Sequence, residues 1–403
     1  MKLEIRSLEE GIAELLKYVQ PIAESEEVGL PEALDRVAAE DIAAPMDNPP
    51  FDRSPLDGYA FAAADSSGAS AAKPAMFRIV GEICAGGSFE GQTGAHEAIR
   101  IMTGAKIPAG CDCVLRQEDI TLTEQGELLV PYPLAKHQNY CFAGEDIRRG
   151  AVLLQKNQVL HAVSIGMLAS MGIARIRVRR QPHIVLASTG DEIIDLEEEL
   201  AEGKIYNSNL YVLVSRLREL GLSVRSLGIL PDDAEQVASV LREKAADADL
   251  ILTTGGVSVG KKDIMHEVVN CLPAKRIFWQ LAMKPGSPVL TYQFGTIPGI
   301  ALSGNPYASL AVFELLVRPV LARLAVNPEL MYKRASGVLC TDFLKKSPSR
   351  RFVRARWQDG RVTLPGHNSS GMLASAAGCN AMLDVPAGTM SLKAGAEVQV
   401  VLL

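Results

Sequence analysis

Apolar residues near the N-terminus recur at the spacing of one helix face between residues 8 and 19. Ser7 and Glu10 precede this run in the S-x-x-E arrangement of a capping box, and Pro21 follows it. The chain is therefore predicted to open with an amphipathic helix that begins after Ser7 and ends before Pro21.

Two later regions have the pattern of β-structure. Between about residues 27 and 150, short apolar runs such as "FRIVGEICAGGSFEG" are divided by glycine and proline. From about residue 328, the runs "RFVRARW", "AMLDVP" and "EVQVVLL" have the same character. Between these regions, "VSIGMLASMGIARIRVRR" predicts a helix, a turn and a strand.

Strand and helix patterns alternate regularly between residues 180 and 325. "HIVLAS" is a continuous apolar run typical of a buried parallel strand, and "NLYVLVSRLRELG" is an amphipathic helix with Gly221 at its C-terminus. "SVRSLGIL" and "LILTTGG" follow as strands, separated by the helix "DDAEQVASVLREKAADA", and "YASLAVFELLVRPVLARL" ends the region as a helix. This order predicts a parallel sheet with helices on both faces.

The predicted fold class is therefore α/β and multidomain, with a central doubly wound, mostly parallel sheet. Four domains are expected: a discontinuous N-terminal helical and linker domain (1–26 and 150–179), an inserted mostly β domain (27–149), the α/β domain (180–327) and a small C-terminal β domain (328–403).

Composition narrows the range of partners. The 403 residues are 48% hydrophobic and 22% charged, which is typical of globular domains. The formal charge of -6 gives no field that favours nucleic acid, so an anionic ligand needs a local basic pocket. No apolar run reaches the length of about 18 residues that a membrane span requires. We expect neither nucleic acid nor a membrane as a partner.

Seven cysteines are scattered through the chain without paired C-x-x-C spacing. This number and spacing favour a reducing compartment, and the N-terminus has no signal peptide, so a cytoplasmic protein is expected. Cys111 and Cys113 form a C-x-C pair that we interpret as two small residues in a turn after Pro108 and Gly110 rather than as a metal site.

The loop "TTGGVSVGKKD" after the strand "LILTTGG" has the residues of a phosphate cradle. Gly255, Gly256 and Gly260 permit turns that bring backbone N–H groups together, and Thr254 and Ser258 add hydroxyl donors. A tight structural turn is the alternative, because the motif is neither G-x-G-x-x-G nor a Walker A sequence.

Acidic residues follow three of the predicted strands. Asp263 lies beside the cradle, where a carboxylate repels a phosphate unless a divalent cation lies between them. Glu192 with Asp191, and Asp232 with Asp233, follow two other strands, although each pair has helix capping as an alternative. Three acidic strand ends at one sheet edge favour a metal.

Further candidates lie in loops elsewhere. "AMKPGSP" supplies Lys284 as a phosphate partner. "PPFDRSPLDGYA" carries Asp52 and Asp57, while "RIMTGAKIPAG" and "AGEDIRRG" carry Thr103, Glu145 and Asp146. Loop carboxylates are usually solvated, so the sequence alone gives these acids no role.

Ten blocks of sequence together resemble the molybdopterin molybdenumtransferase family, which is related to the gephyrin E domain. They run in family order from about residue 45 to 385: "FDRSPLDGYA", "RIMTGAKIPAG", "GEDIRRG", "STGDEI", "YNSN", "DD", "TTGGVSVGKKD", "MKPGSP", "SGNP" and "NSSGMLASAAGCNAM". The resemblance implies an enzyme that inserts molybdate into adenylylated molybdopterin and releases molybdenum cofactor and AMP with the help of magnesium.

The resemblance also implies partners and roles. The expected assembly is a homodimer in which acids of one subunit's inserted domain reach the cleft of the other. Molybdopterin adenylyltransferase and molybdoenzymes are candidate partners. The implied catalytic residues are Asp57, Thr103, Asp146, Glu192, Asp232 and Asp263, of which Asp232 and Asp263 hold magnesium. The implied ligand-binding residues are Gly255, Gly256, Ser258, Gly260, Lys284, Pro285, Gly286, Asn305, Pro306, Arg354, Ser369 and Ser370.

This chain departs from the family pattern near the implied oxyanion site. Ser287 stands where a second lysine is usual, Ser303 replaces a proline, and Lys261 and Lys262 occupy positions where acidic or small residues are common. A tungstate-preferring variant and a non-catalytic scaffold that binds pterin or nucleotide are therefore kept as alternatives. The retained acids favour an enzyme, because a scaffold keeps its turn glycines without needing the carboxylates.

Overall fold

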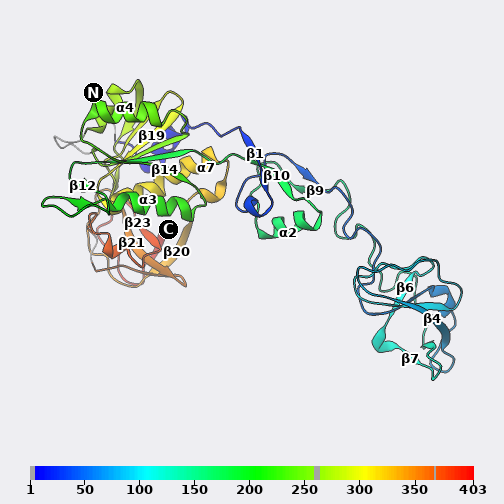
Figure 1. The fold of residues 1–403 in the computed structure, drawn as a ribbon. Helices are drawn as coiled ribbons and strands as arrows, with labels where there is room; N and C mark the ends of the chain where they lie inside the picture. Colours follow the sequence, from blue (N-terminus) through cyan, green and yellow to red (C-terminus); the bar gives the residue numbers. More distant parts are fainter. Residues whose placement is uncertain (1–4, 258–263, 367–368) are drawn as a thin grey trace. The chain divides into compact units, whose positions relative to one another are not determined.

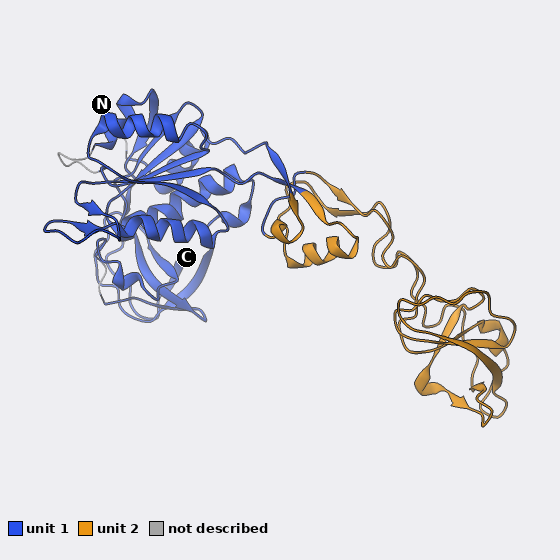
Figure 2. Ribbon diagram, viewed as in Figure 1, with its two compact units in different colours: residues 1–27, 35–39, 177–403 blue, residues 28–34, 40–176 orange. Residues whose placement is uncertain are grey.

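The computed structural model describes residues 5–257, 264–366 and 369–403. The chain divides into two compact units, which are described separately (Figure 2). Unit 1 contains residues 1–27, 35–39 and 177–403, and unit 2 contains residues 28–34 and 40–176. The boundaries of the four expected domains stay a prediction.

A six-stranded mixed sheet forms the centre of unit 1. Its order is β14 (Val224–Leu230), β11 (Ile184–Thr189), β15 (Leu250–Thr254), β19 (Ile297–Leu302), β18 (Leu290–Phe294) and β16 (Ala274–Trp279). The first four strands are mutually parallel, and β18 is antiparallel to both of its neighbours. The predicted mostly parallel sheet is confirmed, with an antiparallel pairing added at one side.

Helices cover both faces of this sheet. One face holds α3 (Ser208–Glu219), α6 (Pro306–Val312) and α7 (Arg318–Leu324), and the other holds α4 (Ala234–Lys244) and α5 (Met265–Cys271). Figure 1 shows α3 and α4 on opposite sides. In β11, Ile184 and Leu186 pack into one cluster and Val185 and Ala187 into the other. Because both faces are buried, the strand is apolar at every position.

The first helix, α1 (Leu8–Leu16), has the predicted capping box. Ser7 Oγ accepts from the Glu10 N–H at 3.2 Å, and Glu10 Oε2 accepts from the Ser7 N–H at 2.9 Å. The helix ends earlier than predicted, because Tyr18 and Val19 donate to carbonyls three residues back and tighten the last turn. Val19 still packs into the core of unit 1.

The helix predicted from residue 307 to 324 is interrupted. A π-helical stretch, Phe313–Val317, joins α6 to α7 just before Pro319. Proline has no N–H to donate to the preceding turn, and a wider turn is one way in which a helix accommodates this loss. Glu314 in this stretch is fully buried, and it pairs with Arg318 and Arg216 at 2.9 and 2.7 Å.

The C-terminal strands of unit 1 close into a small barrel. The strands are β20 (Arg334–Leu339), β21 (Arg350–Gln358), β22 (Arg361–Thr363), β23 (Ala381–Val385) and β24 (Glu397–Leu402). The pairings run β21, β22, β20, β24 and β23, and β23 pairs again with β21. A short strand from the α/β region, β17 (Met283–Lys284), adds beside β21. The small C-terminal β domain is confirmed.

Unit 2 contains a six-stranded, mostly antiparallel sheet. Its order is β6 (Cys113–Arg116), β3 (Gly58–Phe61), β5 (Glu97–Ile101), β4 (Ala75–Ile83), β8 (Leu128–Val130) and β7 (Thr121–Leu122). The unit also contains α2 (Ala162–Ser170) and the strand pair β2 (Ile42–Ala43) and β9 (Val152–Leu154). The strands β1 (Ser25–Gly29) and β10 (Arg175–Arg179) pair with each other, and both continue from one unit into the other.

Cys111 and Cys113 are both buried in unit 2. Cys111 lies in the loop before β6, as predicted, whereas Cys113 is the first residue of that strand. Burial raises the pKa of the Cys111 thiol to about 11 and that of Cys113 to about 12. All seven cysteines are free thiols. Among the described residues, no helix combines the length and the apolar character that crossing a bilayer requires.

Candidate functional site

Three neighbouring strands end at one level at the carboxyl edge of the sheet. Ser188 of β11 pairs with Thr254 of β15, and Thr254 pairs with Leu302 of β19. The loops that follow these strands begin with Gly190, Gly255 and Ser303. Ligands of such sheets bind beyond the carboxyl ends of the strands, so these loops are candidates for the site.

A cavity of about 580 Å³ lies at these strand ends, and we call it the edge cavity. Its described lining includes one carboxylate, Glu192, and no lysine or arginine. It is lined by Thr189, Glu192, Ile193, Ile205, Tyr206, Asn207, Ser208, Asn209, Gly255, Gly256, Val257, Ser303, Gly304, Asn305, Pro306 and Gly371.

Gly255 gives the edge cavity room rather than a hydrogen-bond donor. Its φ is +96°, and a Cβ atom there would lie 2.3 Å from the carbonyl oxygen of Thr189. Its N–H is already used, because it donates to the Leu302 carbonyl at 3.0 Å. A ligand phosphate can approach this glycine closely but cannot take that proton without breaking the bond to Leu302.

The Thr254 hydroxyl does not have the ligand-facing position that we expected. The residue is fully buried, and its Oγ1 donates to Ser188 Oγ at 3.0 Å. Ser188 in turn donates to Asn207 Oδ1 at 3.3 Å. This chain of bonds satisfies the hydroxyl inside the protein, so Thr254 supports the strand ends instead of donating to a ligand.

Two asparagines that the sequence analysis did not single out line the edge cavity. Asn207 caps α3 through its Oδ1, and its buried Nδ2 has no hydrogen-bond partner among the described residues. Asn209 donates from Nδ2 to the Gly304 carbonyl at 2.8 Å, and no residue in the described ranges bonds its buried Oδ1. An unpaired buried polar atom is costly, so each amide can gain from a ligand. The sequence block "YNSN", which contains both asparagines, was the signal that could have identified them.

The acids at the strand ends have different partners. Asp191 and Asp232 are reciprocally bonded, since each accepts from the backbone N–H of the other at 3.2 Å. Asp233 caps α4 by accepting from the Gln236 N–H at 2.9 Å. The capping interpretation therefore applies to Asp233, and Asp232 bridges two strand ends.

The donor chemistry at Asp232 fits part of a magnesium site. Mg²⁺ in proteins usually takes one or two carboxylates together with water and substrate phosphate. Asp232 supplies one such carboxylate, whereas Asp263 lies outside the described residues. Within the ranges that the structure describes, no group of three or more His, Cys, Asp or Glu side chains is placed to hold a metal.

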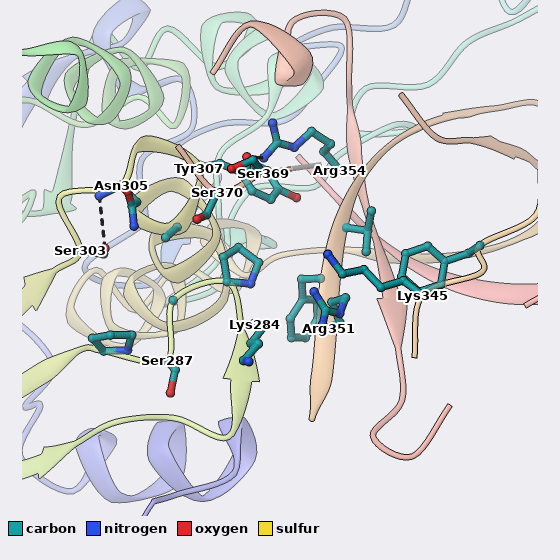
Figure 3. A pocket seen from close by; sticks show the side chains of 17 residues that line it. Lys284, Ser287, Ser303, Asn305, Tyr307, Lys345, Arg351, Arg354, Ser369 and Ser370 are labelled. Carbon is teal, nitrogen blue, oxygen red and sulfur yellow. Dashed lines mark hydrogen bonds between the residues drawn. The ribbon is translucent and has the colours of Figure 1, made fainter. Parts of the chain in front are cut away.

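A second cavity, of about 590 Å³, lies where the α/β region meets the C-terminal barrel, and we call it the cation pocket (Figure 3). Its described lining includes four cationic side chains and no carboxylate. It is lined by Lys284, Pro285, Gly286, Ser287, Pro288, Ser303, Asn305, Tyr307, Ala308, Phe343, Lys345, Arg351, Phe352, Val353, Arg354, Ser369 and Ser370.

Arg354 is the most buried of these cations, with 1% of its surface exposed. It donates to the carbonyls of Met372 and Ser369 and to the Ser375 hydroxyl, and its Nε has no partner in the part of the chain that the structure describes. Its guanidinium carbon lies 3.9 Å from the ring centre of Tyr307, and burial lowers its pKa. No described carboxylate pairs with it, so its charge is available to an anion.

The loop from β17 forms another wall of the cation pocket. Lys284 pairs in register with Arg351 across β17 and β21. Gly286, at φ +89°, packs so closely that a Cβ atom would lie 2.4 Å from Val312 Cγ2. Ser303 and Asn305 line both cavities, so the edge cavity and the cation pocket adjoin.

In unit 2, the structure joins two predicted residues. Asp57 Oδ1 accepts from both the N–H and the hydroxyl of Thr103, each at 2.7 Å. The backbone N–H, followed by the hydroxyl, lowers the pKa of Asp57. Asp146 does not join this pair and accepts instead from Asn48 Nδ2 at 3.1 Å.

Two other acids of unit 2 stabilise a loop. Asp52 accepts from the Tyr140 hydroxyl at 2.6 Å and from the Ala143 N–H at 2.8 Å, and Glu145 accepts from the Phe142 N–H.

The predicted residues thus fall into separate groups. The edge cavity is lined by Glu192, Gly255, Gly256, Asn305 and Pro306. The cation pocket is lined by Lys284, Pro285, Gly286, Asn305, Arg354, Ser369 and Ser370. Ser258, Gly260, Lys261, Lys262 and Asp263 lie outside the described residues. Tyr307, Lys345 and Arg351 were not predicted, because only the folded chain brings them to the pocket.

Known families match most of the sequence. Residues 6–172 match the MoeA N-terminal region (domain I and II), residues 186–323 match a probable molybdopterin binding domain, and residues 336–403 match the MoeA C-terminal region (domain IV). A Staphylococcus aureus protein named molybdopterin molybdenumtransferase is 37% identical over 380 residues, which cover 93% of this chain and 90% of that protein.

The chain belongs to the molybdopterin molybdenumtransferase family. A family member from Staphylococcus epidermidis is 34% identical over 401 residues, which cover 98% of this chain and 95% of that protein. The family is one of transferases, so the predicted resemblance and enzyme class are confirmed.

Solved structures agree with the fold. The crystal structure of the molybdopterin biosynthesis moea protein from Pyrococcus horikosii matches with a TM-score of 0.86 at 29% identity, over 99% of both chains. A molybdenum cofactor biosynthesis protein from Pyrococcus furiosus matches with a TM-score of 0.61 at 20% identity, over 99% of this chain and 100% of that chain.

Proposed function

We propose that this protein inserts molybdate into adenylylated molybdopterin and releases molybdenum cofactor and AMP. The observation that carries the proposal is the pair of adjoining cavities, of about 580 and 590 Å³, that share Ser303 and Asn305 but differ in charge. The phosphoanhydride lies at the edge cavity, and the oxyanion lies in the cation pocket. The two reactants then meet at Ser303 and Asn305.

The oxyanion is held by charge and by hydrogen-bond donors. Molybdate is a tetrahedral dianion, and Lys284 and Arg354 supply positive charge while Ser369 and Ser370 supply hydroxyl donors. The buried Arg354 is preorganised, because its partners fix the guanidinium before the ligand binds.

The phosphates lie against the glycine turn of the edge cavity. Gly255 and Gly256 allow close approach, and Ser258 and Gly260, which lie outside the described residues, are included in the proposed phosphate site because of the family resemblance. Asp232 and Asp263 would hold magnesium, which would supply positive charge beside the phosphates. Glu192, which lines the cavity, orients the water that adds to a phosphate.

Three predicted residues of unit 2 act in a cleft shared between two copies of the chain. Asp57, Thr103 and Asp146 of one subunit contribute to the cleft of its partner in a cytoplasmic homodimer. Mixing tests this arrangement: Asp57→Asn and Arg354→Gln proteins, each inactive alone, regain activity together because some mixed dimers carry one intact cleft. A protein that sediments as a monomer at high dilution, and that is still active at the same dilution, would refute the shared cleft.

The decisive experiment measures AMP release from adenylylated molybdopterin with magnesium and either no oxyanion, molybdate or tungstate. Release stimulated by molybdate supports the proposal. A stronger response to tungstate identifies a tungsten-preferring variant. Tight binding of the pterin nucleotide without release identifies a scaffold that keeps the site but not the reaction.

A further inference from the structure

Two adjacent arginines on β21 have opposite surroundings. Arg350 is neutralised, because its Nε and Nη2 donate to Asp384 at 2.7 and 2.6 Å and its Nη1 donates to Glu9 at 2.5 Å. The side chain of Arg351, the next residue, has one hydrogen bond to the described residues, from Nε to Ser347 Oγ at 3.2 Å, and it lines the cation pocket. Arg350 is not among the described residues that line this pocket, so of these two neighbours only Arg351 presents its charge to it.

Lys345 is a second cation of this kind. It is exposed and lines the same pocket, and no described side chain or carbonyl forms a hydrogen bond or an ion pair with its ammonium group. Its backbone carbonyl accepts from the Ser347 hydroxyl at 3.3 Å. Figure 3 shows its side chain extending from its loop toward the strand that carries Arg351.

The charges in this pocket are unbalanced within the described chain. Lys284, Lys345, Arg351 and Arg354 line it without a carboxylate, in a protein whose formal net charge is -6. Four like charges around one cavity repel each other unless an anion offsets them. Arg354 shows that the pocket is built for a ligand, because its Nε is buried and unpaired in the lining.

We propose that Lys345 and Arg351 bind the free oxyanion as a second cationic wall of the pocket, opposite the wall formed by Arg354, Ser369 and Ser370. The inference rests on the proposed function and extends its substrate site to two residues that carried no assignment. The chemical class of the ligand is a tetrahedral dianion such as molybdate or tungstate, whose charge matches a pair of cations. Lys284, opposite Arg351 in register, connects the two walls.

The test is a binding titration of the full chain with sodium molybdate at low ionic strength, by calorimetry and without the pterin. Lys345→Gln and Arg351→Gln should each weaken molybdate binding about tenfold, since each removes a charge-assisted contact. Lys346→Gln is the matched control, because this neighbouring exposed lysine does not line the pocket. Unchanged binding in both pocket variants, or no binding by the unaltered protein, would overturn the inference.

A second measurement separates this inference from the proposed function. In the AMP-release assay, Lys345→Gln and Arg351→Gln should raise the KM for molybdate about tenfold and leave kcat within about twofold. If the unaltered protein binds molybdate but releases no AMP, the proposed function fails and the titration still decides the inference. If AMP release is normal and the KM is unchanged in both variants, only the inference fails.

Discussion

The edge cavity and the cation pocket are nearly equal in volume and share two residues, but they differ in charge. The edge cavity has Glu192 and two incompletely bonded amides in its described lining, whereas the cation pocket has four cations. One chain thus keeps acidic and basic groups in separate compartments that adjoin at Ser303 and Asn305.

This separation suits a reaction between two anions. A cation placed beside Glu192 would form an ion pair with it, because opposite charges within about 4–6 Å stabilise each other. The paired cation would then bind an oxyanion less tightly. Carboxylates placed in the cation pocket would repel the oxyanion. The acids and the lysine belong to different strands of the fold. The acids follow β11 and β14, whereas Lys284 lies on β17 beside β21.

The largest expected effect comes from disrupting the edge cavity. Gly255→Ala places a Cβ against the Thr189 carbonyl at a positive φ, so the free energy of unfolding should fall by about 4 kcal/mol. Gly295→Ala is the control, because it also has a positive φ but no atom within 4 Å. Urea unfolding of both variants measures the difference, and equal losses would show that the contact with Thr189 is not the cause.

The second largest effect is expected from a substitution in the cation pocket. Arg354→Lys keeps the charge but loses the planar fork that bonds Met372, Ser369 and Ser375, so AMP release at limiting molybdate should fall about 100-fold. Affinity for AMP at the edge cavity should stay unchanged. Arg356→Lys, an exposed change on the same strand, is the control, and equal losses in the two variants would contradict the assignment.

A smaller effect tests the arginine that faces away from the pocket. Burial alone would raise the pKa of Asp384, but hydrogen bonds from Arg350 and Arg334 outweigh it and lower the pKa. This stabilisation is present above the unfolded-state pKa of about 3.9 and is lost as pH falls through the lower native value. Arg350→Gln should therefore cost about 2 kcal/mol at pH 7, and the difference from the unaltered protein should shrink toward pH 3.

Thermal and urea unfolding between pH 7 and pH 3 measure this dependence on pH. The same Arg350→Gln protein should bind molybdate with unaltered affinity, since Arg350 is neutralised by Asp384 and Glu9. A weakened affinity for molybdate would show that Arg350 also contributes to the oxyanion site, although Asp384 and Glu9 neutralise it.

The smallest effect extends the comparison to unit 2. Thr103→Val removes the hydroxyl that donates to Asp57 but keeps the backbone N–H, which has the larger influence on its pKa. The pKa of Asp57 should rise toward its ordinary value and stay below it. NMR titration of the Asp57 carboxyl measures the change, and an unaltered pKa would show that the backbone bond acts alone.

The sequence by itself determined the elements and their layers. Periods of 2 and 3.6 residues are local, so "HIVLAS", "NLYVLVSRLRELG" and the capping box at Ser7 predicted β11, α3 and the start of α1. The glycine turn and the acidic strand ends were also predictable, because parallel strands bring their carboxyl ends to one edge.

Only the tertiary structure decided which polar groups are used within the protein and which are left for a ligand. Thr254 donates to Ser188, and Arg350 differs from Arg351 because Asp384 and Glu9, both far away in the sequence, bond Arg350. Barrel closure and the pairing of β17 with β21 likewise place Lys284 beside Arg351. Hydrogen bonds and ion pairs depend on distances of a few ångströms in the folded chain, and no local pattern specifies those distances.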